Sequence, residues 1–442
     1  IKAGGPGGFN AYGVSIPGLP GLVIGFTRST AWGLTNGMDD VFDWHALRLR
    51  GDTLAAAGAP HVAPVEYLWR GRWRALRRVP DTILVRGAPA VVDTQLWTHA
   101  GPVPVHPGEA PFGKNSLPGH ALQWTALAPS NELGAFLRLL TAEDVPAFRR
   151  AIRDLHTPAQ NIVFATRSDI ALAHQGRIPA KRSGQGRLVA GGAVAEAKEW
   201  RAYIPQARLP FAHNPERGWL ASANQEVTAP GYEWYLGSNF YPPERAQRLH
   251  RLLFPATDLT PADAFDILLD NRSRHAGRAL PLLLRHLPEP DSAADSARAH
   301  AVALLRGWDF RYAATAAAPV LFDAWWRAFH TAVWDDDLRG DTAAYPVPSR
   351  VVTLGLLATD SAHAVFDDSR TSARETAGDL VRAAFDSALA AFRAAPASAR
   401  GAAGMPTWGL ARPAAVPHLL RLPSLGRGNL AVDGCGECLN AQ

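Results

Sequence analysis

The stretch Tyr12–Trp44, YGVSIPGLPGLVIGFTRSTAWGLTNGMDDVFDW, carries most of the information about the fold. It begins with an apolar run broken by Gly and Pro, which predicts a buried strand flanked by turns. An Ala-Trp-Gly-Leu-Thr-Asn turn follows, and then carboxylates at Asp39, Asp40 and Asp43. The segment therefore predicts a buried strand, a sharp turn with free backbone amides, and a candidate site for a hard cation.

The composition is that of a large globular protein. The chain has 442 residues, of which 47% are hydrophobic and 19% charged, which is long for one simple domain. Lys and Arg (45) exceed Asp and Glu (40) only slightly, and the arginines are scattered, so solvated faces are favoured over a nucleic-acid groove. No run of about 18 apolar residues occurs, so we expect no membrane span. The chain begins with Ile1, which indicates a processed product or a fragment.

The pattern of elements predicts a β-rich front, a helical middle and a Pro/Gly-rich tail, with boundaries at residues 1–255, 256–400 and 401–442. Strands are expected at 22–26, 82–85 and 161–166, and the aromatic–basic alternation of Trp69–Arg74 predicts another. Thr141 with Asp144 resembles a capping box that opens a helix, and Thr260-Pro261 opens a second one. Further helices are expected at 293–305, 320–334 and 373–394.

Several common catalytic and binding patterns are absent or weak. The sequence has no G-x-S-x-G elbow and no H-E-x-x-H motif. Gly426–Ala431 fits a loose dinucleotide pattern but opens no helical pattern. Cys435 and Cys438 lack the further ligands of a zinc site, so a local disulfide or two inert thiols is expected. The 14 Trp residues suggest a carbohydrate-binding function. However, they lie mostly inside helical patterns and the motifs quoted below, which argues against an exposed sugar-binding surface.

Two other features are better candidates. Asp40 and Asp43, with the carbonyl of Phe42 between them, offer the oxygen ligands that calcium prefers, although an exposed acidic turn or a helix start would look the same. Asn36 lies in a turn, and Asn224 ends a run of small residues that would let a substrate approach closely. Either could donate to a developing oxyanion, or could be an ordinary structural amide.

An ordered set of segments resembles the β subunit of the penicillin acylase family, in the superfamily of N-terminal-nucleophile hydrolases. No single segment is decisive, but the set covers nearly the whole chain in the family's order. The segments are GVSIPGLPGLVIG (Gly13–Gly25), AWGLTN and DDVFDW (within Ala31–Trp44), THAGPV (Thr98–Val103), LQWTA (Leu122–Ala126), PAQNIVFAT (Pro158–Thr166), GRIPAK (Gly176–Lys181), NPERGWLASANQ (Asn214–Gln225), YLGSNFYPPER (Tyr235–Arg245), LRGWDFRY (Leu305–Tyr312) and LFDAWW (Leu321–Trp326).

The resemblance implies an α+β fold, the four-layer αββα sandwich of this superfamily with a helical subdomain. It also implies a precursor that cuts itself into α and β subunits. The nucleophile would be the new N-terminal Ser of the β subunit, with its own α-amine as the base. That Ser is expected about forty residues before the Gly13 segment, outside this chain, so the chain alone is expected to be inactive. Ser15 and Ser29 lack a free α-amine and are not candidates.

The resemblance assigns roles to individual residues. The oxyanion donors would be the backbone N–H of Asn36 and the side-chain amide of Asn224, with Arg245 orienting the active-site amide. Val23, Ile24, Leu34 and Trp124 would line an apolar acyl pocket, although plain core packing explains apolar side chains equally well.

The resemblance also implies one structural calcium ion. Its ligands would be the carboxylates of Asp40 and Asp43 and the carbonyl of Phe42, with Gly186 as a further carbonyl ligand. One family carboxylate is not matched: Glu233 is the nearest candidate and aligns poorly.

Three readings of the function follow. The first is an amidohydrolase that cleaves a small-molecule N-acyl amide, with penicillins or acyl-homoserine lactones as substrate classes. The second is a catalytically inactive, acylase-like binding protein, which the residues encoded before Ile1 would distinguish from the first. The third, a carbohydrate-binding protein, is weaker for the reason given above. By family alone, the protein is expected in the periplasm or secreted, paired with an α subunit.

Overall fold

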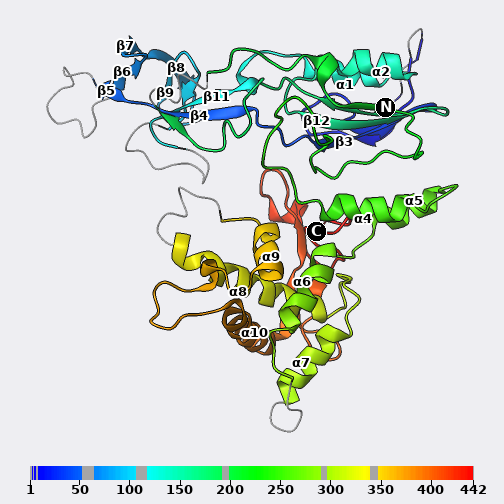
Figure 1. Cartoon of the computed structure of the whole chain (residues 1–442). Coiled ribbons are helices and arrows are strands. Elements are labelled where there is room, and N and C mark those ends of the chain that lie inside the picture. The colour runs from blue at the N-terminus through cyan, green and yellow to red at the C-terminus, as the bar shows by residue number, and fades with distance from the viewer. Residues whose placement is uncertain are drawn as a thin grey trace. The chain divides into compact units, whose positions relative to one another are not determined.

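The computed structural model describes residues 2, 4–5, 8–51, 64–105, 117–191, 199–289, 296–338 and 347–441. The chain divides into two compact units, Ile1–Tyr241 and Pro242–Gln442 (Figure 1). The first unit holds most of the strands and the second most of the helices, as the sequence predicts. Among the described residues, no helix combines the length and apolar character that crossing a membrane requires.

A six-stranded antiparallel sheet forms the centre of the first unit. Its strands lie in the order β1 (Tyr12–Val14), β2 (Ile24–Phe26), β3 (Ala31–Asn36), β12 (Gln160–Ala165), β13 (Ile170–Gln175) and β15 (Phe211–His213). The apolar runs expected at 22–26 and 161–166 are β2 and β12. The sheet thus joins the N-terminal segment to strands more than a hundred residues away.

Two helices, α1 (Glu132–Leu139) and α2 (Val145–Ile152), pack on one face of this sheet (Figure 1). Phe148 of α2 stacks on Phe164 of β12 with ring centroids 4.6 Å apart, and Trp32 of β3 is buried in the same core. The cap of α2 differs from the expected box, because the Asp144 carboxylate itself accepts the N–H of Ala147. Thr141 lies before the cap.

Three smaller sheets complete the first unit. They are β11 (His120–Trp124), β4 (Phe42–Ala46) and β14 (Ala190–Gly191); β5 (Leu49–Gly51), β6 (Pro64–Trp69) and β7 (Arg72–Ala75); and β10 (Pro102–Val103), β9 (Val91–Trp97) and β8 (Arg77–Ile83). The strand expected over Trp69–Arg74 is wrong, because Arg70 and Gly71 form a two-residue turn between β6 and β7. Alternation continues across a tight hairpin, so the pattern does not reveal the turn.

The second unit is built around α8 (Ala318–Leu338). Trp325 is fully buried there, donates its indole N–H to the carbonyl of Val381 at 3.0 Å, and packs on Phe385 at 4.7 Å. The helices expected at 293–305, 320–334 and 373–394 correspond to α7, α8 and α10, and Thr260 caps α5 as expected. The other helices are α4 (Glu244–Leu253), α5 (Pro261–Leu268), α6 (Arg274–Leu284), α7 (Ser296–Arg306), α9 (Arg350–Thr359), α10 (Ala377–Arg393) and α11 (Trp408–Ala411).

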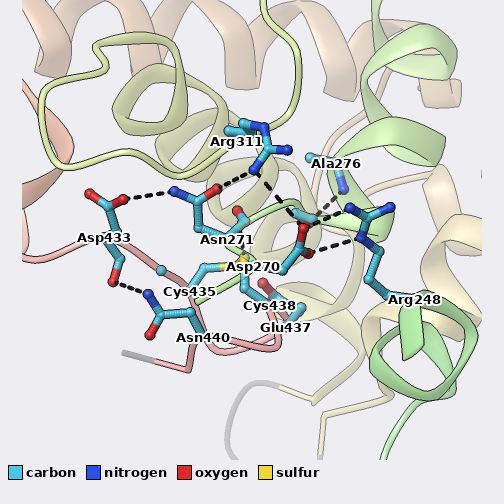
Figure 2. Close-up of a disulfide and its surroundings, with 12 residues drawn as sticks. Arg248, Asp270, Asn271, Ala276, Arg311, Asp433, Cys435, Glu437, Cys438 and Asn440 are labelled. Carbon is cyan, nitrogen blue, oxygen red and sulfur yellow. Dashed lines mark hydrogen bonds and ion pairs between the residues drawn. A yellow bond between two sulfur atoms is a disulfide. The ribbon is translucent and has the colours of Figure 1, made fainter. Parts of the chain in front are cut away.

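The tail belongs to the second unit. After β16 (Ala414–Val416) and β17 (Arg427–Leu430), Cys435 and Cys438 form a buried disulfide (Figure 2). Beside it, the amide of Asn271 donates to Asp433 at 2.9 Å, which ties the tail to the helical core (Figure 2). The boundaries expected at 255/256 and 400/401 differ from this division, because the tail shares its core with the helices.

Candidate active site

The backbone of Asn36 is exposed at one edge of the central sheet. Asn36 is the last residue of β3, and the next residue, Gly37, donates its N–H to the carbonyl of Ala159 at 2.8 Å. Hydrogen-bonded pairs alternate in an antiparallel ladder, so the N–H and C=O of Asn36 point away from β12. In the described part of the chain, β2 pairs with β3 only at Ala31 and Trp32, so it does not cover this edge at Asn36.

Asn224 meets Asn36 at that edge. Its side-chain amide donates to the carbonyl oxygen of Asn36 at 3.0 Å, although the two residues are 188 positions apart. The loop around it is held to β3 by a 2.7 Å hydrogen bond between the hydroxyls of Thr35 and Ser222. Asn224 has a φ of 64°, a left-handed backbone that costs free energy and is often found at functional sites. The two predicted oxyanion donors are therefore brought together.

The turn after β3 has little free space. A Cβ on Gly37 would lie 2.3 Å from Oδ2 of Asp39 and 2.9 Å from Cε1 of His174, so only glycine fits there. The turn expected over Ala31–Asn36 is instead strand β3, and the chain turns after it, where Met38 has a positive φ of 63°. Gly37 is thus needed for room, not for its backbone freedom.

A buried polar network supports this turn from the sheet. The imidazole of His174 lies 2.9 Å from Asp39 and 2.7 Å from the side-chain oxygen of Asn161, and the side chains of His174 and Asp39 are fully buried. The amide of Asn161 donates in turn to Thr35 at 3.3 Å and to the carbonyl of Asn36 at 3.4 Å. These contacts link a buried acid–imidazole pair to the backbone that carries the candidate oxyanion donor.

The predicted metal ligands also come together, but around a lysine. Nζ of Lys181 lies 2.8 Å from Oδ1 of Asp40, 3.1 Å from Oδ1 of Asp43 and 3.3 Å from the carbonyl oxygen of Phe42. Gly186 borders the same cluster, since a Cβ built on it would lie 2.3 Å from Asp40 and 2.7 Å from Asp43. Burial raises the pKa of Asp40, while its attraction to Lys181 opposes the rise.

These side chains, as arranged, do not fit a calcium ion. Calcium takes six to eight oxygen ligands at about 2.3–2.6 Å, and the centre of this oxygen set is held by an ammonium. No group of three or more His, Cys, Asp or Glu side chains suited to a metal occurs among the residues the structure describes. Calcium therefore stays a prediction of the family resemblance, which metal analysis can test.

The predicted acyl-pocket residues do not share one face. Gly25 pairs with Trp32, which places Ile24 on the opposite face of the sheet from Trp32 and Leu34. Ile24 is 40% exposed, whereas Leu34 packs against the core under α1 and α2. Val23 is half-buried, and its carbonyl accepts the indole N–H of Trp32 at 3.1 Å. Trp124 lies at the end of β11, on another sheet. Val23 and Leu34 are both half-buried, and Leu34 packs against the same core as Trp32.

Arg245 lies in the second unit, on the first turn of α4, whereas Asn36 and Asn224 lie in the first. Because the two residues lie in different units, the expected role of Arg245 at the active-site amide stays a prediction.

Comparisons with known proteins define first the fold and then the family. The structure matches penicillin G acylase from Alcaligenes faecalis with a TM-score of 0.67, over 98% of this chain and 80% of that chain, at 18% identity. This shows that the chain shares the α+β fold of that protein and confirms the expected fold class. The family model described as penicillin amidase matches residues 2–442, so the chain belongs to the penicillin amidase family.

Curated relatives match only with part of their length. Acyl-homoserine lactone acylase QuiP of Pseudomonas fluorescens Pf-5 is 29% identical over 241 residues, 54% of this chain and 28% of that protein. The acylase of the same name from Pseudomonas syringae pv. tomato is 27% identical over 76% of this chain and 40% of its own length. Penicillin acylase 2 proenzyme of Pseudomonas sp. SE83 is 31% identical over 34% of this chain and 19% of its length. The chain thus matches well under half of each of these relatives.

Sequence reasoning missed the residues that support the site. No sequence pattern assigns a role to Lys181, His174 or Asn161, and Asp39 is predicted only as part of the acidic cluster, not as a partner of His174. A lysine is ordinarily solvated, so only its burial reveals a partner. The one signal available was the pair of polar residues inside apolar strands, Asn161 and His174, because polar side chains in a sheet core need partners.

Proposed function

We propose that the protein acts as an amidohydrolase on small-molecule N-acyl substrates, with Asn36 and Asn224 as its oxyanion donors. The observation that carries the proposal is the meeting of these two residues at the open edge of β3, where the Asn224 amide lies 3.0 Å from the Asn36 carbonyl. An N–H and a side-chain amide directed to one edge can together stabilise the oxyanion of a tetrahedral intermediate. Membership of the penicillin amidase family supports the same reaction class.

In this proposal the chain supplies the groups that stabilise the oxyanion. The attacking group is an N-terminal Ser, Cys or Thr that the resemblance places before Ile1, and its α-amine accepts the proton. As this group attacks the amide carbon, negative charge develops on the carbonyl oxygen. The charge is met by the N–H of Asn36 and the amide of Asn224, the latter turning from its contact with Asn36. Collapse of the intermediate releases the amine, and water then releases the acid.

Acyl-homoserine lactones are the substrate class we propose first. Six of the relatives are named acyl-homoserine lactone acylases, and one is named a penicillin acylase. The half-buried apolar pair Val23 and Leu34 near Trp32 suits an acyl chain better than a polar group. We further propose a processed precursor, an α subunit as partner, and export from the cytoplasm, all of which rest on the family.

The test is amine release by the mature protein from acyl-homoserine lactones of graded chain length and from penicillin G. Asn224→Ala should lower kcat by about 10²–10³-fold with little change in thermal unfolding, because one oxyanion donor is removed. Gln95→Ala is a matched control, since this amide donates to Asp93 on the same strand and should leave the rate unchanged. Activity of Asn224→Ala within tenfold of the parent would refute the assignment. A parent that binds these amides without cleaving them would favour the inactive, binding reading.

A further inference from the structure

The acidic cluster after β3 contains a buried cation of its own. The side chain of Lys181 is 1% exposed, yet it carries a charged group, which is costly unless that group is paired. Its ammonium faces one oxygen each from Asp40, Asp43 and Phe42, at 2.8, 3.1 and 3.3 Å. An ammonium has three N–H donors, so three oxygen atoms satisfy it completely.

The distances are those of an ammonium and not of a calcium ion. Hydrogen bonds from nitrogen to oxygen are about 2.7–3.2 Å long, whereas calcium–oxygen distances are about 2.3–2.6 Å. The Asp40 and Asp43 oxygens lie within the first range, and the carbonyl oxygen of Phe42 lies slightly beyond it. The spacing of the three oxygens therefore matches an ammonium group.

Trp200 provides a second reason to assign the position to an ammonium. Its ring lies 5.1 Å from Nζ of Lys181, within the range of a cation–π contact, and its indole N–H donates to Oδ2 of Asp43 at 2.6 Å. An aromatic ring attracts an ammonium but offers no oxygen ligand to a calcium ion. One of the two Asp43 oxygens is thus committed to Trp200, and the other faces Lys181.

Charge balance argues in the same direction. The cluster holds two carboxylates and one ammonium, so the ammonium of Lys181 offsets one of the two formal negative charges. A calcium ion among the same oxygens would stand within a few ångströms of the ammonium, and two cations at that distance repel strongly in a buried site. Calcium could therefore enter only if Lys181 left.

We propose that Lys181 is the resident cation of this cluster and occupies the position that the family resemblance gives to calcium. The protein then needs no bound metal to hold the turn between β3 and β4. Lys181 pairs with Tyr235 in an isolated β-bridge, and the N–H of Asp40 donates to the carbonyl of Leu236 at 2.8 Å. The lysine thus ties three separate segments of the first unit, one of which begins at Asn36. Its role is positional, not catalytic.

The test compares thermal unfolding of the mature protein in excess EGTA and in millimolar calcium chloride. The parent should have the same Tm in both, within about 1 °C, and should contain no stoichiometric calcium by elemental analysis. Lys181→Ala leaves two carboxylates without their cation, so its Tm should fall in EGTA and rise by about 3 °C or more in calcium. The double variant Lys181→Ala/Asp40→Asn is the matched control, because it lacks one ligand and should lose this response.

Each outcome decides the question. A parent that retains one calcium per chain, or whose Tm falls in EGTA, would overturn the proposal even if Lys181→Ala failed to fold. A folded Lys181→Ala that calcium does not stabilise would also overturn it, because the oxygens would then not form a cation position. These readouts are metal content and Tm, so they are independent of whether the protein hydrolyses N-acyl amides.

Discussion

A single buried histidine should make the helical unit sensitive to acid. His275 on α6 is 2% exposed, and neither ring nitrogen has a hydrogen-bond partner among the residues the structure describes. Its ring packs edge-on against Trp326, with centroids 4.4 Å apart. Burial, together with smaller contributions from the nearby charges of Arg350, Arg278 and His330, lowers the pKa of His275 to about 3.

The direction and size of the effect follow from proton linkage. The unfolded chain takes up a proton at His275 near its ordinary pKa of about 6.5, whereas the folded chain does not until about pH 3. Stability is therefore fully present above pH 6.5 and is lost as the pH falls below it. Each pH unit costs about 1.4 kcal/mol, so the free energy of unfolding should fall by about 2 kcal/mol between pH 6.5 and pH 5. This figure is the same for any folded pKa well below 5.

The assay is urea unfolding of the mature protein at pH 7.5 and pH 5, followed by the helical band of the far-UV circular dichroism spectrum, because most helices lie in the second unit. His275→Gln removes the titrating group at similar volume, so the variant should lose about 2 kcal/mol less than the parent on acidification. His300→Gln, on the exposed face of α7, is the matched control and should behave as the parent does. If His275→Gln lost as much stability as the parent, the buried neutral histidine would not be the source of acid sensitivity.

Two further changes test the close packing of the site and the role of the disulfide. Gly186→Ala should destabilise the protein by about 2 kcal/mol or more, because its Cβ would lie 2.3 Å from a carboxylate oxygen and φ is +88°. Gly218→Ala is the control, because Gly218 has a φ of +72° but open space around it, so this variant measures the backbone cost alone. If both variants lost the same free energy of unfolding in urea, the carboxylates would have moved aside without cost. Replacing Cys435 and Cys438 by Ala should cost about 2 kcal/mol, the loop-closure value for so short a span, and a loss above about 5 kcal/mol would mean that the bridge also holds the tail in its core.

The local elements could be predicted because their signals lie within a few residues. The strand at 22–26 and the cap at Thr260 depend on neighbouring side chains, and the structure contains both. The Trp69–Arg74 hairpin could not be predicted by alternation, because both arms continue the same period. The fold class came from the order of motifs along the chain, which is a property of the family rather than of any one segment.

The site was predicted less completely, since its contacts join distant segments. Lys181 and Asp40 are 141 positions apart, and nothing local to either residue identifies the other as its partner. The acidic residues alone resemble a metal site, whereas in the structure the ammonium of Lys181 lies among them. The face of Ile24 likewise depends on strand register, which the pairing of Gly25 with Trp32 fixes and the sequence does not show.

The position of the candidate oxyanion site explains why two buried hydrogen-bonded pairs flank one short turn. Asn36 is the last residue of β3, so the N–H that would bind the oxyanion lies at the end of the hydrogen-bonded strand. The His174–Asp39 pair holds the turn on the sheet side, and the Lys181–Asp40 pair holds it where the chain enters β4. A donor stabilises a transition state only if it is already aimed when charge develops. Buried polar pairs contribute little net stability, but the hydrogen bonds that they make hold the groups on either side in one geometry. The two pairs therefore serve to position this turn more than to stabilise the fold.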